Sequence, residues 1–164
     1  MQQNNPIMSY HTSKKLPYGV SNFITIVEQN NYYVDKTMYI PMLEDEASNL
    51  FFIRPRRFGK SLFLGMLHAY YDCRTKDKFE QWFGKLWIGQ HPTPNQGRYQ
   101  VLHLDFSQVG GKIEKLEEKF NEYCCIALND FMFLYDTYYP ESCKKEFYDS
   151  NDAGAKLSII SRKA

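Results

Sequence analysis

The sequence predicts an α/β fold, because two apolar segments with the length of buried strands alternate with helical segments. The candidate strands are residues 50–53 and 99–106. Apolar residues recur every three or four positions over 60–72 and 112–138, which is the spacing of amphipathic helices. A sheet of two strands is small for covering the wide apolar faces of these helices. We therefore expect a helix-rich core with few parallel strands.

Shorter helices complete the predicted order of elements. Ser21 precedes an apolar set typical of a short helix, and a second helical stretch runs from about Thr37 to the acidic residues 44–46. Aromatic residues at helical spacing occupy 76–87, and Pro140 ends the helix that precedes it. Further short helical segments are expected over 142–148 and 157–160.

Composition and the N-terminal residues indicate the domain organisation. Residues 1–13 are polar, and we expect them to form a mobile N-terminal arm. Of the 164 residues, 43% are apolar and 16% aromatic, which is enough for a hydrophobic core. No linker divides residues 14–164, so we expect them to belong to one domain.

The loop between the first strand and the first long helix carries the strongest functional pattern. Residues 54–61 read Arg-Pro-Arg-Arg-Phe-Gly-Lys-Ser. In a phosphate-binding P-loop, a glycine lets backbone N–H groups curl around phosphate, a lysine reaches the β and γ phosphates, and a hydroxyl binds Mg²⁺. Gly59, Lys60 and Ser61 suit these three roles, although Arg54 stands where the full pattern has its first glycine. The following helix directs the positive end of its dipole to the same point.

We therefore predict that ATP and Mg²⁺ bind at this loop, with Ser61 as the metal ligand. Arg56 and Arg57 would either add charge beside the phosphates or pair with acidic residues of the rest of the protein. The alternative structural interpretation is a basic turn between two core elements, in which the lysine and the arginines are simply solvated. The predicted nucleotide-binding residues are Arg56, Arg57, Phe58, Gly59, Lys60, Ser61 and Leu62.

Residues 54–61 resemble the P-loop of bacterial AAA-ATPase-like proteins almost letter for letter, and Arg54 is usual in that family. The likeness extends to 16–23, 32–37 and 101–107 and covers most of the chain from about Lys14 onward. It implies a P-loop NTPase-like three-layer αβα core, incomplete here, of which residues 14–164 would be the N-terminal part. The family's proteins are longer and commonly carry a PD-(D/E)XK nuclease-like domain. The resemblance thus implies the remainder of the parent chain as a partner and nucleic acid as a target of the fused domain.

ATP hydrolysis also needs an acidic strand that holds Mg²⁺ through water, usually beside a glutamate that activates the attacking water. Asp105 ends the second candidate strand, but Phe106 follows it where the glutamate is expected. In the resembled family a later strand ends in an Asp-Glu pair, and the sequence shows no such strand after the long helix. We expect this chain alone to bind ATP with negligible hydrolysis, and no catalytic residue is assigned.

Alternatively, the chain is a non-enzymatic module that binds nucleic-acid phosphate or a protein partner through Arg54, Arg56 and Arg57. The formal net charge is +1, so the basic residues gather in one loop and are not spread over a face as nucleic-acid binding usually requires. Binding that depends on salt and not on Mg²⁺ would distinguish this alternative from nucleotide binding.

Cysteines, histidines and hydropathy indicate no further site. The cysteines form no CxxC pair, so we interpret them as reduced and mostly buried thiols and expect no zinc site. His68 and His103 are interpreted as structural. No apolar run approaches the roughly 20 residues of a spanning helix, and the first residues do not resemble a signal peptide. We expect a cytoplasmic protein without membrane contact.

Overall fold

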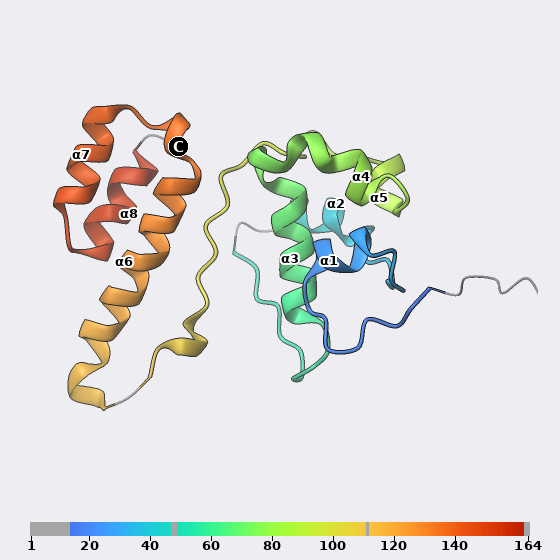
Figure 1. The fold of residues 1–164 in the computed structure, drawn as a ribbon, viewed down its shortest axis with the longest axis horizontal. Helices are drawn as coiled ribbons and strands as arrows, with labels where there is room; N and C mark the ends of the chain where they lie inside the picture. Colours follow the sequence, from blue (N-terminus) through green and yellow to red (C-terminus); the bar gives the residue numbers. More distant parts are fainter. Residues whose placement is uncertain (1–13, 47–48, 111, 163–164) are drawn as a thin grey trace, which may run out of the picture. The chain divides into compact units, whose positions relative to one another are not determined.

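A computed structural model describes residues 14–46, 49–110 and 112–162, and these residues form helices joined by irregular chain (Figure 1). The predicted arm over residues 1–13 lies outside the described residues. The chain packs as two compact units, which meet between Arg98 and Tyr99 in the sequence. The boundary directly follows residues 91–97, a turn-rich segment with two prolines and a glycine, and falls beside a predicted strand.

The first unit is built around the helix α3. Aromatic and aliphatic side chains from five helices meet in one core, and α1 packs along α3. The elements are α1 (Phe23–Glu28), α2 (Tyr39–Glu44), α3 (Lys60–Tyr71), a 3-10 helix (Cys73–Lys78), α4 (Phe79–Phe83) and α5 (Trp87–Gln90). The buried core residues are Phe23, Ile40, Phe63, Met66, Ala69, Tyr70, Trp82, Phe83 and Ile88.

The second unit is a small helical cluster. Its elements are two 3-10 helices (Phe106–Gln108 and Ile113–Lys115), α6 (Leu116–Leu134), a third 3-10 helix (Asp136–Tyr138), α7 (Glu141–Asp149) and α8 (Ala153–Ser161). Lys156 of α8 is buried among them, where its ammonium donates to Asn129 Oδ1 (2.9 Å) and to the carbonyl of Phe147 (3.0 Å). Desolvation lowers the pKa of Lys156 below its ordinary value.

The α/β prediction, with its three-layer αβα core, is wrong for the described residues, which contain helices and no sheet. Residues 50–53 lie exposed, with Phe51 91% and Ile53 88% accessible to solvent, and residues 99–105 are likewise irregular. The physical reason is that a strand gains its backbone hydrogen bonds and its burial from neighbouring strands. The described residues offer no such neighbouring strand to either segment, and of their residues only Tyr99 forms an isolated β-bridge, so the strand-like sequence remains irregular chain.

The helical predictions are largely confirmed. The structure ends α3 one residue before the predicted limit, and α6 forms the centre of the predicted 112–138 helix, with a 3-10 turn at each end. The expected 142–148 helix is α7, and 157–160 lies within α8. Residues 76–87 differ, because they divide among a 3-10 helix, α4 and the start of α5.

Asp35 fixes the segment that leads into α2. One carboxylate oxygen accepts hydrogen bonds from the backbone N–H (2.8 Å) and the hydroxyl (2.7 Å) of Thr37. The other oxygen accepts from the N–H of Trp87 at the start of α5 (2.7 Å). The Thr37 hydroxyl in turn accepts from the N–H of Ile88 (3.1 Å). Residues 35–37 are thereby joined to a helix about 50 positions later in the sequence.

Replacing Asp35 by alanine is expected to lower the free energy of unfolding by about 2 kcal/mol, because hydrogen bonds to a charged group contribute roughly 1.5–3 kcal/mol. Chemical denaturation followed by tryptophan fluorescence measures this change, since both tryptophans, Trp82 and Trp87, lie in the first unit. Asp149→Ala, at an exposed position of the second unit, is the control. Equal midpoints for Asp35→Ala and wild type would contradict the structural role.

Candidate phosphate-binding site

The site forms where the basic loop enters α3. Gly59 is the N-cap residue of this helix, and no side chain caps it. The N–H of Phe63 donates to the carbonyl of Gly59 (2.9 Å), which is the first bond of the helical ladder. The N–H groups of Lys60, Ser61 and Leu62 therefore precede the ladder and have no acceptor within the helix. Such a helix start attracts anions, because its orphan donors and the helix dipole act together.

Two residues of the loop adopt the left-handed backbone conformation. Gly59 has φ of +75° and Arg57 has φ of +67°. A Cβ at Gly59 would meet no atom within 4 Å, so the backbone angle and not the available space favours glycine there. At Arg57 the same conformation costs roughly 1–2 kcal/mol, since an L residue crowds its own backbone. Backbone strain of this kind concentrates at binding loops.

The Lys60 side chain folds back across the loop. Its ammonium donates to the carbonyl of Arg54 (2.7 Å) and to that of Pro55 (3.0 Å). These bonds hold the start of the loop against the start of α3 and place a positive charge inside the turn. Only the backbone of Arg54 takes part, so the contact does not require glycine at that position. The Arg54 guanidinium lies 5.1 Å from the centre of the Phe52 ring.

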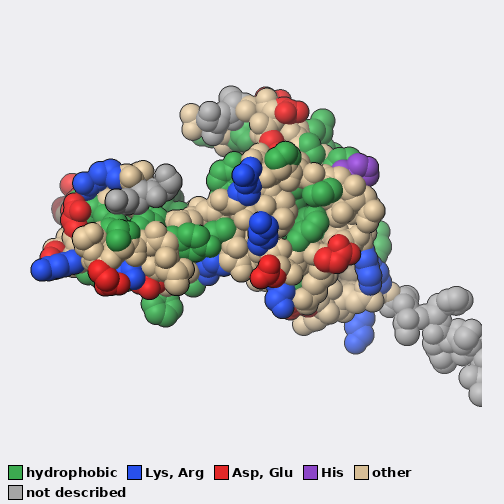
Figure 2. All heavy atoms as spheres, turned by 90° about the horizontal axis from the view of Figure 1, so that it is seen from above, with side chains coloured by type: hydrophobic (Ala, Val, Ile, Leu, Met, Phe, Trp, Pro, Cys, Tyr) green, Lys and Arg blue, Asp and Glu red, His purple; other side chains and the backbone are tan. Residues whose placement is uncertain are grey.

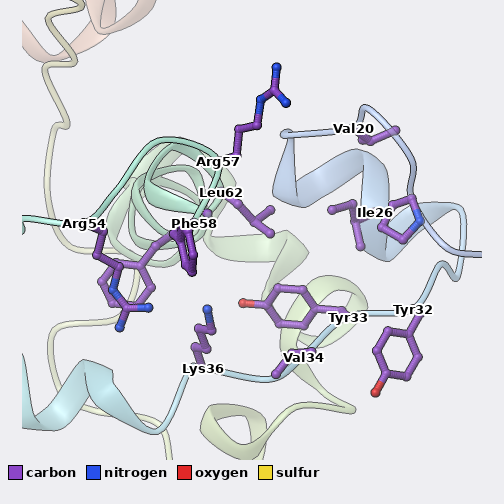
Figure 3. Close-up of a pocket in the computed structure, with 13 residues that line it drawn as sticks. Val20, Ile26, Tyr32, Tyr33, Val34, Lys36, Arg54, Arg57, Phe58 and Leu62 are labelled. Atoms are coloured by element: carbon purple, nitrogen blue, oxygen red, sulfur yellow. The ribbon is translucent and has the colours of Figure 1, made fainter.

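The loop forms one wall of a pocket of about 760 Å³ and contributes the basic side chains of Arg56, Arg57 and Lys60 to it. Residues 18–21 form the opposite wall. The structure thus brings together six of the seven predicted nucleotide-binding residues: Arg56, Arg57, Gly59, Lys60, Ser61 and Leu62. Phe58, the seventh, lines a second pocket of about 380 Å³, which is shown in Figure 3.

Sequence reasoning did not identify Tyr18, Gly19, Val20 and Ser21 as part of the site. Tyr18 is fully exposed and Gly19 has a left-handed φ of +74°, which shapes the turn facing the loop. The signal available in the sequence was the Leu-Pro-Tyr-Gly turn pattern at 16–19. Nothing in that pattern shows that the turn faces a loop about 40 residues later.

Asp105 and His68 have structural contacts. The Asp105 carboxylate accepts a hydrogen bond from the N–H of Ser107 (3.0 Å) and caps a 3-10 helix of the second unit. Hydrogen bonds from Ser107 are the main cause of a lowered Asp105 pKa. The His68 imidazole lies 3.3 Å from the carboxylate of Asp72. Within the described ranges, no three His, Cys, Asp or Glu side chains gather as a metal site.

Comparison with known proteins decides the family. The model of a family described as a predicted AAA-ATPase matches residues 17–164, which is nearly the whole chain. The chain belongs to this predicted AAA-ATPase family. This confirms the resemblance seen in residues 54–61, and the match includes both walls of the pocket of about 760 Å³.

One curated relative extends the comparison. It is an uncharacterized protein in the vnfD 5′ region of Azotobacter chroococcum mcd 1, and it is 51% identical over 109 residues. The matched region covers 63% of this chain and 20% of the relative, so this predicted AAA-ATPase chain matches about one fifth of the relative's length. No solved structure matches the chain. No helix in the described part of the chain is long and apolar enough to cross a membrane.

Proposed function

We propose that the loop over residues 54–61 and the start of α3 bind the phosphates of ATP together with Mg²⁺. The observation that carries the proposal is the uncapped helix start at Gly59, with the Lys60 ammonium beside it and a pocket lined by Arg56 and Arg57 in front of it. Orphan N–H groups and a fixed cation complement a triphosphate, which has several negative oxygens. Membership of a predicted ATPase family supports the same ligand.

The roles of the residues follow from their positions. The N–H groups of the loop and of Lys60, Ser61 and Leu62 donate to phosphate oxygens, and Lys60 exchanges its loop carbonyls for the β and γ phosphates. Arg56 and Arg57, which line the same pocket, add positive charge. The proposal concerns binding and assigns no catalytic base.

The residues also fit Mg²⁺, although Ser61 is the sole protein ligand proposed. Mg²⁺ retains several waters and is commonly held by one or two protein oxygens plus phosphate oxygens. The Ser61 hydroxyl is exposed at the pocket wall, where it can supply one such oxygen. When bound, the ion neutralises phosphate charge.

Nucleic-acid binding by the same arginines is less well supported. The formal net charge is only +1, and on the face that Figure 2 draws Lys and Arg side chains are interspersed with Asp and Glu, whereas phosphate-backbone binding favours an excess of basic side chains. The Arg54 guanidinium also lies over a ring of the protein's own chain.

Lys60→Ala is expected to weaken ATP binding by at least about 10- to 100-fold, because it removes charge-assisted hydrogen bonds to phosphate. Calorimetric titration of ATP with excess Mg²⁺ measures the affinity, and Lys85→Ala, at an exposed lysine of the same unit, is the control. Circular dichroism would show whether both variants keep the fold. Equal ATP affinities for Lys60→Ala and wild type would contradict the proposal. Tight binding of a single-stranded oligonucleotide without Mg²⁺, lost at high salt, would favour the nucleic-acid alternative.

A further inference from the structure

We propose that a small cavity lined by α2 and α3 binds a small monocarboxylic acid whose body is one ring or a short alkyl chain. The cavity has a volume of about 120 Å³. Apolar cavities of about this size, 150 Å³ in one engineered protein, accept a ligand as large as benzene. Most of the wall is formed by aromatic and aliphatic side chains of α2, of the 50–53 segment, of the loop and of α3, which are Tyr39, Leu43, Phe52, Phe58 and Phe63.

The inner wall of the cavity is fixed and its outer wall is open to solvent. The rings of Phe52 and Phe63 stack with their centres 4.9 Å apart. Phe63 belongs to the buried core of the first unit, and Leu43 packs against that core. Tyr39 and Phe58, in contrast, are 46% and 61% exposed. A small ligand can therefore enter on their side without displacing a core residue.

The charged side chains that line the cavity, Lys36 and Arg54, are both basic. Figure 3 shows both of them ending on the same side of the Phe58 ring. The Arg54 guanidinium lies 5.1 Å from the centre of the Phe52 ring, which is itself a wall of the cavity. Because guanidinium N–H groups lie in the plane of the group, contact of its face with a ring leaves them free to donate to a carboxylate.

The nearby carboxylates have other partners and do not neutralise this pair of cations. Within the described ranges neither Lys36 nor Arg54 forms an ion pair. Both carboxylate oxygens of Asp35 accept hydrogen bonds from backbone N–H groups. Glu44, at the end of α2, accepts from hydroxyl groups of α3 (3.0 Å) and of residues 91–97 (2.8 Å). The two cations are therefore available to an anion from outside.

A carboxylate with an apolar body fits this arrangement better than a phosphate. Phosphate has oxygens on every side, and those facing the apolar walls would lose their hydrogen bonds to water without replacement. A monocarboxylic acid has its oxygens at one end, where Lys36 and Arg54 can donate to them, and its body against the rings. The chemical class of ligand is thus a small, singly charged organic acid.

This site does not depend on ATP binding. The cavity adjoins the pocket of about 380 Å³, whose wall includes residues 32–34 and which also contains Lys36 and Arg54. Of the residues that line the pocket of about 760 Å³, Gly59 alone also lines the cavity. Arg56 lines that larger pocket and not the cavity, so it provides a control from the same basic loop.

Benzoate is the probe, because it combines one ring with a carboxylate. Calorimetric titration into the full chain should give a Kd at or below about 1 mM. Benzamide has the same shape without the charge and should bind at least about tenfold more weakly. Nuclear Overhauser contacts between the benzoate ring protons and the Leu43 methyl groups would place the ligand in the cavity. Equal affinities for benzoate and benzamide, or no saturable binding of benzoate, would overturn the proposal.

Lys36→Met and Arg54→Met each remove one charge and keep an apolar stem. Each should weaken benzoate binding at least about fivefold and change benzamide binding less than about twofold. Arg56→Met, at an exposed position of the same loop, should change neither affinity. Unchanged benzoate affinity in both Lys36→Met and Arg54→Met overturns the site. An equal loss in Arg56→Met does so too, because it would show general attraction of anions to the basic loop.

Leu43→Trp fills the cavity and should abolish benzoate binding. Met42→Trp places the same side chain at an exposed position of α2 outside the cavity and should leave the affinity unchanged. Circular dichroism shows whether both variants keep the fold, and the methionine variants decide alone if Leu43→Trp does not. Wild-type benzoate affinity in a folded Leu43→Trp protein would place the ligand elsewhere and contradict the proposal.

Discussion

Replacing Asp72 by alanine is expected to lower the free energy of unfolding of the first unit by about 3 kcal/mol. The Asp72 carboxylate is buried at the end of α3 and accepts hydrogen bonds from the guanidinium of Arg74, with the shortest contact at 2.6 Å. It also accepts from the N–H of Arg74 (2.9 Å) and so caps the next 3-10 helix. The substitution removes charged hydrogen bonds and a helix cap together, which contribute roughly 1.5–3 and about 1 kcal/mol.

Urea denaturation followed by tryptophan fluorescence measures the Asp72 effect, because both tryptophans report on the first unit. The control is Asp77→Ala, an exposed carboxylate on the same 3-10 helix, for which we expect a change within about 0.5 kcal/mol. An Asp72→Ala protein as stable as Asp77→Ala would show that the buried ion pair contributes nothing net.

The Asp72 carboxylate should also make the free energy of unfolding depend on pH in the acid range. Burial alone would raise the pKa of Asp72, but hydrogen bonds from His68 and Arg74 outweigh this effect and hold the pKa well below its ordinary value. Because the folded state favours the carboxylate, this stabilisation is complete above the unfolded pKa of about 3.9 and is lost as the pH falls below it. Asp72→Asn should therefore lose less stability than wild type between about pH 5 and pH 2.

Local sequence patterns predicted the part of the site that depends on local structure. The apolar spacing after Lys60 fixed the helix, and Gly59, Lys60 and Ser61 lie at its start as the motif required. The pocket walls at 18–21 and 32–36 could not be predicted in this way. They reach the loop through packing of α1 on α3 and through the bond from Trp87 to Asp35, which join residues far apart in the sequence.

The predicted sheet failed for a related reason. Apolar residues at 50–53 indicated burial, but burial of a strand depends on partners that a strand cannot supply itself. The chain matches about one fifth of the length of its Azotobacter relative, and no partner strand occurs among its described residues. Phe51 and Ile53 are consequently exposed apolar side chains, of the kind that marks an interaction surface or a tendency to associate.

Phe83→Ala is expected to lower the free energy of unfolding by about 3–5 kcal/mol, as truncation of a buried phenylalanine leaves a cavity. Phe83 is fully buried, and its ring centre lies 5.1 Å from that of Phe23, 5.6 Å from that of Tyr70 and 5.7 Å from that of Phe79. It therefore joins α1, α3 and α4 in one core. Urea denaturation with tryptophan fluorescence measures the loss.

Phe51→Ala is the matched variant, and its stability distinguishes the observed helical core from the sheet that the sequence predicted. A phenylalanine inside a buried strand would cost as much to truncate as Phe83, whereas an exposed one should change stability by no more than about 0.5 kcal/mol. With its side chain 91% exposed, Phe51 belongs to the second case. Binding of a dye that detects exposed apolar surface should also fall in Phe51→Ala and not rise. A stability loss in Phe51→Ala comparable to that in Phe83→Ala would mean that residues 50–53 are buried, and the core described for the first unit would then be incomplete.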